Sequence, residues 1–262
     1  MNRIDQELLS RGLARSRTDA AKLLAAGRVL LAGEPVTKAS KKVDASDDIT
    51  VVPAEGEEYV SRAGHKLAGA LGVFTTVNPE GLRCLDAGAS TGGFTDVLLR
   101  RGANHVVAAD VGHGQLVASI REDPRVSVHE GLNVRYLMPE DIGGVVDLVV
   151  ADLSFISLRL VIPALAAATK TGGSLVLMVK PQFEVGREHL NRTGVVTDPV
   201  LRKWAVEAVI ASAQSAGLKL RGLARSPLAG QDGNAEFFLW LVADEDARAH
   251  DVPLIELNVD YS

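Results

Sequence analysis

From residue 61 onward, short runs rich in β-branched residues alternate with stretches of helical periodicity. Strands are expected at 82–86, 105–110, 126–129, 145–152 and 174–180. The helices that separate or follow them are expected at 93–101, 115–121, 158–169 and 199–216. Such alternation specifies a mostly parallel sheet that is covered by helices on both faces. Two further apolar runs, 218–224 and 237–242, are expected to add an antiparallel edge. The sequence therefore predicts an α/β domain built on a seven-stranded sheet.

The first 50 residues carry a different pattern, that of a small α/β unit. An amphipathic helix is expected to end at Gly12, and Ser16 with Asp19 forms a capping box for a second helix. Short strands are expected at 29–31 and 49–52, joined through a turn at 33–35. A polar segment then marks a domain boundary. We expect domains of residues 1–58 and 61–262, with a linker at about 53–60.

Charge and composition narrow the classes of partner. Residues 1–50 hold nine Lys or Arg and seven Asp or Glu, whereas the whole chain has a net charge of -5. Because residues 1–50 have a small positive net charge and the rest of the chain is acidic, an anionic partner is expected to bind at residues 1–50. Aromatic residues make up only 4% of the chain, so a wide base-stacking platform is not expected.

The sequence also argues against membrane, secreted and metal-cluster classes. No run approaches the ~18 apolar residues of a membrane helix, and the first residues lack the layout of a signal peptide. The single cysteine, Cys84, excludes an intramolecular disulfide or a multi-cysteine metal site. We therefore expect a cytoplasmic protein that holds no metal.

A glycine-rich turn follows the first strand of the large domain, where residues 86–94 read Asp-Ala-Gly-Ala-Ser-Thr-Gly-Gly-Phe. A dinucleotide-binding turn would need glycine where Ser90 stands. The pattern G-x-S-x-G of a hydrolase fits residues 88–92, but the best later base, His189, lies in a polar stretch typical of a solvated loop. The remaining interpretation is a nucleoside cofactor without a pyrophosphate, bound beside the helix that follows.

Polar residues follow consecutive strands as this interpretation requires. Asp86 is placed to bond, directly or through water, to an amino-acid ammonium; Asp110 can accept from ribose hydroxyls; and Asn133 can reach an adenine edge. The carboxyl ends of parallel strands meet over the switch point of the sheet. This is the layout of an S-adenosylmethionine site, whose candidate residues are Asp86, Gly88, Ser90, Thr91, Gly92, Gly93, Phe94, Asp110 and Asn133.

Four more charged residues stand on or beside the predicted elements of the large domain, namely Lys66, Asp152, Lys180 and Glu236. A lysine that emerges from a buried strand is costly to desolvate unless it is paired or functional. Each of the four also has a plain structural interpretation. Lys66 fits a surface helix, Glu236 fits the edge of a sheet, and Asp152 with Lys180 fits an ion pair.

Four separated motifs surround these residues in order along the chain. They are Ser-Arg-Ala-Gly-His-Lys-Leu at 61–67, Asp-Leu-Ser-Phe-Ile-Ser-Leu at 152–158, Lys-Pro-Gln-Phe-Glu at 180–184 and Gly-Asn-Ala-Glu-Phe-Phe at 233–238. Together they resemble the TlyA (hemolysin A) family of ribosomal RNA 2′-O-methyltransferases, which have an FtsJ-like catalytic domain. The first 29 residues resemble the S4 RNA-binding domain. The resemblance covers essentially the whole chain, and Ala63 stands where relatives often have glycine.

The resemblance implies a Rossmann-like, class I S-adenosylmethionine-dependent methyltransferase domain behind a small S4-like RNA-binding domain. Lys66, Asp152, Lys180 and Glu236 would form its Lys-Asp-Lys-Glu tetrad. In that tetrad Lys180 would accept or steer the proton of a ribose 2′-hydroxyl, Lys66 would stabilise the alkoxide, Asp152 would orient Lys180, and Glu236 would hold the lysines in register.

The substrate implied is ribosomal RNA, at a cytidine of the small or large ribosomal subunit, 30S or 50S. In the S4-like domain, the residues expected to contact RNA phosphates are Arg3, Arg11, Arg15, Arg17, Lys22 and Arg28.

Three alternatives stay open at this stage. Methylation of a base amine usually needs two prolines after the fourth strand, and residues 152–155 read Asp-Leu-Ser-Phe. A non-catalytic RNA-binding or ribosome-assembly factor would need the S4-like domain but not the tetrad. A membrane-active role, suggested by the name hemolysin, finds no signal peptide or spanning segment in the sequence.

Overall fold

The computed structural model describes residues 2–14, 16–25, 27–52, 58–230, 232–243 and 259–262. The chain divides into two compact units, Met1–Glu58 and Tyr59–Ser262. Each unit has a hydrophobic core of its own. Most of the segment predicted as a linker, 53–57, lies outside the described residues.

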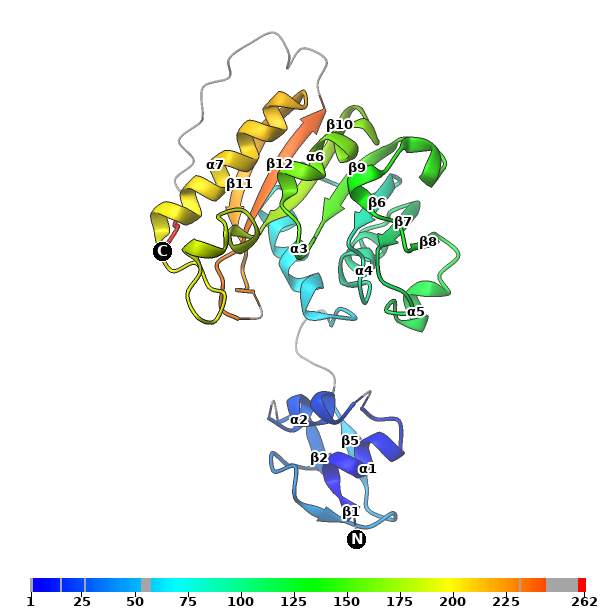
Figure 1. Cartoon of the computed structure of the whole chain (residues 1–262). Coiled ribbons are helices and arrows are strands. Elements are labelled where there is room, and N and C mark those ends of the chain that lie inside the picture. The colour runs from blue at the N-terminus through cyan, green and yellow to red at the C-terminus, as the bar shows by residue number, and fades with distance from the viewer. Residues whose placement is uncertain (1, 15, 26, 53–57, 231, 244–258) are drawn as a thin grey trace. The chain divides into compact units, whose positions relative to one another are not determined.

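The N-terminal unit packs two helices with short antiparallel strands (Figure 1), which are β1 (Asn2–Arg3), α1 (Ile4–Ser10), α2 (Arg17–Ala25), β2 (Val29–Leu31), β3 (Glu34–Pro35), β4 (Lys42–Val43) and β5 (Ile49–Val51). The Oγ of Ser16 accepts a hydrogen bond from the Asp19 N–H at 3.1 Å, which is one contact of the predicted capping box. The turn predicted at 33–35 is displaced by one residue. Ala32 and Gly33 take positive φ angles of 50° and 83° and make a two-residue hairpin, so Glu34 already pairs with β2.

The large unit is a seven-stranded sheet with helices on both faces (Figure 1). Its strands are β6 (Arg83–Ala87), β7 (His105–Asp110), β8 (Val126–Glu130), β9 (Val146–Ala151), β10 (Thr169–Val179), β11 (Leu218–Arg225) and β12 (Phe237–Ala243). The strand order is β11-β12-β10-β9-β6-β7-β8. The five strands from β10 to β8 are parallel, and β12 runs antiparallel to β10 and β11. The predicted sheet and its antiparallel edge are confirmed.

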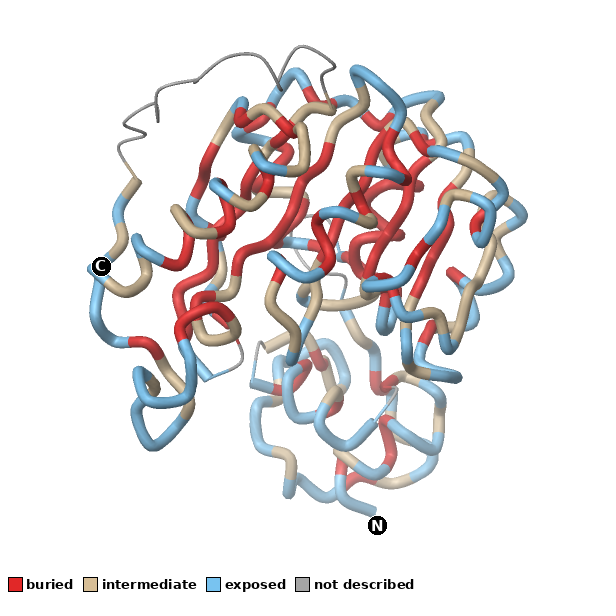
Figure 2. The backbone as a smooth tube through the Cα atoms, turned by 45° about the horizontal axis from the view of Figure 1, so that its top comes forward, coloured by how far each residue is buried: buried red, intermediate tan, exposed pale blue. Residues whose placement is uncertain are grey.

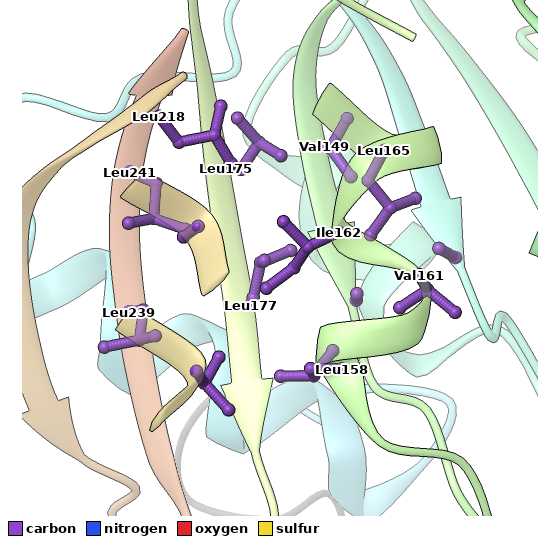
Figure 3. Close-up of a cluster of buried hydrophobic side chains, with 14 of the residues drawn as sticks. Val149, Leu158, Val161, Ile162, Leu165, Leu175, Leu177, Leu218, Leu239 and Leu241 are labelled. Atoms are coloured by element: carbon purple, nitrogen blue, oxygen red, sulfur yellow. The ribbon is translucent and has the colours of Figure 1, made fainter. Parts of the chain in front are cut away.

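The helices form two layers, and their bounds are α3 (Arg62–Val73), α4 (Gly93–Arg100), α5 (Ala118–Arg121), α6 (Ile162–Ala167) and α7 (Pro199–Ser215). Buried side chains of α3, α4 and α5 share one core with Val176 and Met178 of β10. Leu175 and Leu177 point to the other face and pack with α6 and α7 (Figure 3). This alternation follows from the two-residue period of a strand. With helices on both faces, β6 and β9 are buried along most of their length, and β10 is buried from Leu175 onward (Figure 2).

The helix predicted over 115–121 is shorter than expected, since only Ala118–Arg121 is helical. The side chain of Gln115 accepts a hydrogen bond from the Ser90 Oγ at 3.2 Å, and the Val117 N–H donates to the Thr91 carbonyl at 3.4 Å. The first part of this segment is therefore a loop that is bonded to the glycine turn.

The helix predicted over 158–169 is interrupted. A 3₁₀ turn at Leu158–Leu160 precedes α6, in which Pro163 stands in the first turn. A proline has no N–H to donate inside a helix and favours the first turn of a new one. Thr169 already belongs to β10.

The strand order also fixes where a ligand can bind. From β6 the chain continues to β7 and β8 on one side of the sheet, and then crosses to β9 and β10 on the other. In open α/β sheets, ligands bind at the carboxyl edge of the strands at such a switch point. Among the described residues, no helix has both the length and the apolar character needed to cross a lipid bilayer.

Candidate active site at the carboxyl edge of the sheet

The glycine-rich turn leaves β6 through three residues with positive φ. Gly88 has φ +88°, Ser90 +45° and Gly92 +97°. A Cβ at residue 88 would lie 2.8 Å from the carbonyl oxygen of Asp152, so only glycine fits between the two neighbouring strand ends. The Ser90 conformation is rare for a residue with a side chain. It is fixed by its own N–H, which donates to the Asp110 Oδ2 at 2.9 Å.

A cavity of about 460 Å³ opens beside this turn. Its walls come from the end of β7 and from the loops that follow β6, β7, β8 and β9, namely Gly88, Ser90, Ala109, Asp110, Val111, Gln115, Leu132, Asn133, Val134, Asp152, Leu153, Ser154, Phe155 and Ile156. Most of the wall is apolar, and a few polar groups converge on it, which is the usual composition of a small-molecule site. The structure thus brings Gly88, Ser90, Asp110 and Asn133 together, four of the residues predicted to bind the cofactor.

Asp110 and Asn133 are held by backbone groups at the rim of the cavity. The two carboxylate oxygens of Asp110 accept hydrogen bonds from the N–H groups of Ser90 at 2.9 Å and Gly112 at 2.7 Å. A carboxylate has about four lone-pair sites, so each oxygen can still accept a ribose hydroxyl. The Oδ1 of Asn133 accepts from the Arg135 N–H at 3.0 Å and caps a short 3₁₀ turn.

Asp86 is placed differently from the expectation that it meets a ligand at the strand end. It is completely buried, it does not line the cavity, and its Oδ2 accepts from the Thr95 Oγ1 at 2.6 Å. Its Oδ1 is buried without a hydrogen-bond partner among the described residues. Burial raises the pKa of Asp86 to about 7, with the charges of Asp152 and Asp110 adding to the effect and the Thr95 hydrogen bond opposing it.

The other predicted members of the turn also lie outside the cavity wall, namely Thr91, Gly92, Gly93 and Phe94. Phe94 is 3% exposed and packs in the core with Phe238, at 6.2 Å between ring centroids. A Cβ at Gly93 would collide with the Ser61 Oγ, so this glycine lets α4 approach the start of α3. In this structure these residues shape the turn, and their role as cofactor contacts stays a prediction.

The four charged residues singled out in the sequence meet at the same edge of the sheet. Asp152 and Lys180 directly follow the parallel neighbours β9 and β10. Glu236 directly precedes β12, whose first residue pairs with Val179, so it stands beside Lys180 in the register. Lys66 reaches the group from α3.

These residues form two lysine–carboxylate pairs. Lys66 Nζ donates to Glu236 Oε2 at 2.6 Å, and both residues are buried, at 8% and 3% exposed. Lys180 Nζ lies 2.6 Å from Asp152 Oδ1 as an ion pair and donates a hydrogen bond to the Ser154 Oγ at 2.9 Å. The angles at Asp152 Oδ1 are not those of a hydrogen bond, so this contact is electrostatic.

The two pairs act on one another. Burial raises the pKa of Glu236, whereas the hydrogen bond from Lys66 and the charges of Lys66 and Lys180 lower it, and the charge of Asp152 raises it further. Because Lys180 and Asp152 both influence this carboxyl, the four residues form one electrostatic cluster at the end of the cavity where Asp152 lies.

Comparisons with known proteins agree with this geometry. Residues 59–243 match the FtsJ-like methyltransferase family, and residues 2–49 match the S4 domain. The chain belongs to the FtsJ-like methyltransferase family. The cofactor of this methyltransferase is therefore S-adenosylmethionine.

Several relatives match this chain over nearly its whole length. The 16S/23S rRNA (cytidine-2′-O)-methyltransferase TlyA of Mycobacterium tuberculosis is 54% identical over 244 residues, covering 93% of this chain and 91% of that protein. Hemolysin A of Brachyspira hyodysenteriae is 37% identical over 236 residues, covering 90% and 97%. A solved structure from Streptococcus thermophilus, also named a hemolysin, superposes with a TM-score of 0.73 at 40% identity, covering 93% and 89%.

Three residues of the methyltransferase site were not singled out from the sequence. Gln115 and Ser154 line the cavity and bond to Ser90 and Lys180. Phe155 is 92% exposed at the rim, in the left-handed region at φ +62°, with its ring 5.3 Å from that of Phe183. An aromatic residue that follows an apolar strand is normally predicted to lie in the core. The only sequence signal for Phe155 is its position in the motif at 152–158.

The basic residues of the S4 domain differ in what they already contact. Arg11 is committed to the fold, because it pairs with Glu7 at 3.0 Å and donates to backbone carbonyls of residues 44, 45 and 47. Arg28 bonds to the Val52 carbonyl and to Glu58, and Arg3 pairs with Asp5 at 2.9 Å.

Two of the predicted RNA contacts remain more open. Arg17 and Lys22 are exposed on α2, and within the described part of the chain neither forms an ion pair. Arg15 lies outside the described residues. Arg17 and Lys22 on the exposed face of α2 are therefore better placed to bind an anionic ligand than Arg11, whose guanidinium is already bonded within the domain.

Proposed function

We propose that this protein transfers a methyl group from S-adenosylmethionine to the 2′-hydroxyl of a cytidine in ribosomal RNA. The observation that carries the proposal is the cluster of two lysine–carboxylate pairs at the end of the cofactor cavity. The name of the Mycobacterium tuberculosis relative, a 16S/23S rRNA (cytidine-2′-O)-methyltransferase, supports the choice of substrate. By that name, both the 30S and the 50S subunit are candidate substrates.

The cavity residues fit the cofactor. Gly88 lets the turn pass close to the Asp152 carbonyl at the cavity wall, and Asp110 and Asn133 offer acceptors and donors for a ribose and a base edge. S-adenosylmethionine supplies an electrophilic methyl group on a sulfonium centre. The unpartnered Asp86 Oδ1 is a buried polar atom at the base of the turn that still has hydrogen-bonding capacity.

The Lys180–Asp152 pair is suited to hold and deprotonate a hydroxyl group. An ammonium group has three N–H donors. Lys180 Nζ donates one of them to the Ser154 Oγ and lies beside the Asp152 carboxylate as an ion pair. Another N–H can orient the ribose oxygen for in-line attack. As the oxygen attacks, its proton passes to the Asp152 carboxylate, so Lys180 steers the hydroxyl group and Asp152 takes up the proton.

The Lys66–Glu236 pair contributes a second positive charge at the same place. Lys66 is held rigidly because its stem and its ammonium are buried against Glu236. A fixed charge in a site with little water stabilises a developing alkoxide more than a mobile one. Glu236 lets two lysines lie close together without strong repulsion.

Phe155 gives the rim a surface for an unstacked base. Single-stranded or extruded nucleotides are commonly recognised by stacking on aromatic side chains. The exposed ring of Phe155, supported by Phe183, lies on the loop that begins at Asp152. The low aromatic content argues against a wide base-stacking platform, but it allows stacking of a single base on Phe155.

The first experiment measures transfer of labelled methyl from S-adenosylmethionine to unmodified 30S and 50S subunits. Wild type is compared with Lys180→Ala and with Lys170→Ala. Lys170 pairs with Asp147 at 2.5 Å at the opposite ends of β9 and β10, so it is a matched control. We expect label at an alkali-resistant phosphodiester with wild type and Lys170→Ala, and loss of at least about 100-fold with Lys180→Ala.

Three other results of this methyl-transfer experiment would contradict the proposal. Full activity of Lys180→Ala would reject the assigned mechanism. Binding of S-adenosylmethionine without transfer to either subunit would reject these subunits as substrates. If neither cofactor binding nor transfer is found, the remaining function is that of a non-catalytic RNA-binding factor.

A further inference from the structure

The motif Lys-Pro-Gln-Phe-Glu at 180–184 ends in a residue that the proposed reaction does not use. Glu184 is 4% exposed in the turn that follows β10. Burial raises its pKa, against hydrogen bonds from Ser157 and the Leu158 N–H and the charge of Arg159. A buried carboxylate is costly to desolvate unless its hydrogen bonds are made. Its partners therefore indicate what it holds in place.

The partners described for this carboxylate all come from the loop that follows β9. Glu184 Oε1 accepts from the Leu158 N–H at 2.7 Å, and Oε2 accepts from the Ser157 Oγ at 2.5 Å and the Arg159 Nε at 3.2 Å. Arg159 Nη2 also donates to the Glu184 carbonyl at 3.1 Å. Glu184 thus takes part in four hydrogen bonds to the segment that follows β9.

The same loop and turn carry one of the lysine–carboxylate pairs. Asp152 and Ser154 hold Lys180 at the near end of the loop, and Glu184 holds its far end. Between these points Phe155 takes a positive φ of 62°. A strained backbone of this kind persists only where the surrounding contacts fix it.

We propose that Glu184 is a positioning residue for methyl transfer. It locks the loop at 152–158 against the turn at 180–184, so that Asp152 and Ser154 keep Lys180 Nζ at the reacting oxygen and Phe155 stays turned outward. This inference rests on the proposed function. Glu184 acts through Lys180 and does not touch the substrate, and misplacement of a reacting group by ~1 Å can cost about 100-fold in rate.

The test uses Glu184→Ala and Glu184→Gln in the full-length protein, with Asp147→Ala as the matched control. Asp147 also joins two segments, through the Arg83 N–H at 3.0 Å and Lys170 at 2.5 Å, but at the opposite edge of the sheet. For each variant, kcat and KM on the ribosomal subunit, the Kd for S-adenosylmethionine and the unfolding midpoint in urea are measured.

We expect Glu184→Ala to lower kcat by about 30-fold or more with the Kd for S-adenosylmethionine unchanged. Glu184→Gln should lower kcat by about fivefold, because an amide keeps one acceptor oxygen where three donors converge. Asp147→Ala should lower the unfolding midpoint and leave kcat unchanged. The fluorescence of Trp204 should change only in the Glu184 variants, since the Arg159 guanidinium lies 5.8 Å from its ring.

A wild-type kcat in folded Glu184→Gln and Glu184→Ala would overturn the proposal. So would equal losses of kcat in Glu184→Ala and Asp147→Ala, because a general loss of stability would then explain both. If Glu184→Ala does not fold, Glu184→Gln decides alone. If the wild-type protein does not methylate the ribosomal subunits, the proposed function itself is rejected. That result is obtained before any variant is compared with the wild type.

Discussion

A lysine–aspartate pair lies at each end of strands β9 and β10, and the two pairs have similar distances but differ in how far they are exposed to solvent. At the amino edge, Lys170 and Asp147 lie 2.5 Å apart with side chains 54% and 26% exposed. At the carboxyl edge, Lys180 and Asp152 lie 2.6 Å apart, but their side chains are only 11% and 17% exposed. Two pairs of the same residue types, joining the same strands, thus differ in their exposure to solvent.

The difference comes from what surrounds each pair. The pKa of Asp147 is lowered by the hydrogen bond from Lys170 and by the Arg83 N–H, as expected for a solvated pair. The carboxyl edge holds a second buried pair, Lys66–Glu236, and in that pair burial raises the pKa of Glu236. At the amino edge, the pair therefore favours the charged form of its carboxyl group. At the carboxyl edge, burial beside the cavity disfavours the charged form of Glu236.

Breaking a buried pair should have the largest effect. Lys66→Met leaves Glu236 buried without its partner, and we expect folding to lose about 3–5 kcal/mol at pH 8. Lys170→Ala at the amino edge should cost no more than about 1 kcal/mol. Urea unfolding of the two variants and the wild type measures this difference.

A double variant separates folding from chemistry. Lys66→Met with Glu236→Gln removes both charges and should recover most of the lost stability, because no buried charge is left unpaired. Methyl transfer should not recover. Restored turnover in the double variant would show that this pair only maintains the fold.

Glycines at the two edges sharpen the comparison further. Gly88→Ala places a Cβ 2.8 Å from the Asp152 carbonyl, and we expect about 100-fold weaker binding of S-adenosylmethionine with a lower kcat. Gly144, at the opposite edge, has φ +110°, but a Cβ at this residue would meet no heavy atom within 4 Å. Gly144→Ala should therefore cost stability through backbone strain alone. Isothermal titration with the cofactor checks both variants, and equal Kd values would contradict the role of Gly88.

Most of the framework of this edge could be predicted from the sequence. The alternation of strands and helices determines a parallel sheet, and the carboxyl ends of its strands must then meet at one edge. Asp152, Lys180 and Glu236 could be placed there because each borders an apolar run that reads as a strand. Lys66 needed the family resemblance, since a lysine on an amphipathic helix normally faces water.

The parts that the sequence did not predict depend on contacts between distant segments. Asp86 and Phe94 looked like ligand contacts, but Thr95 and Phe238 bury them. Arg11 looked like a phosphate contact, but carbonyl groups more than 30 residues away bind its guanidinium. No local pattern reports such partners, and the same holds for the exposed ring of Phe155.

The pH dependence of stability should have opposite signs at the two edges. Asp86 titrates at about 7 in the folded protein and near ~3.9 when unfolded. The native state then binds more protons between these values, so the contribution of Asp86 to the free energy of unfolding falls as pH rises through this window. Asp147 has a lowered pKa. Its contribution is present above the unfolded pKa and is lost as pH falls through the folded value.

Substitution by asparagine isolates each contribution. Between pH 5 and pH 8, the unfolding free energy of wild type relative to Asp86→Asn should fall by roughly 2–3 kcal/mol. Relative to Asp147→Asn it should stay constant in that range and fall only below about pH 4. Denaturant titrations at pH 3.5, 5 and 8 test both. A flat difference for Asp86 would mean that its carboxyl is ionised in the native state.

The smallest effect is expected from the exposed aromatic side chain at the rim. Phe155→Ala removes a ring that is 92% exposed, so the free energy of unfolding should not change. Because Phe155 also lines the rim of the cavity, the Kd for S-adenosylmethionine is measured separately from KM. If the ring stacks on a base, KM for the ribosomal subunit should rise by about tenfold, which corresponds to ~1.4 kcal/mol of stacking. Phe155→Trp should keep a low KM, whereas Phe155→Leu should behave like alanine. Because leucine matches the ring in apolar character but lacks a π face, a low KM for Phe155→Leu would show that the rim contributes apolar contact rather than stacking.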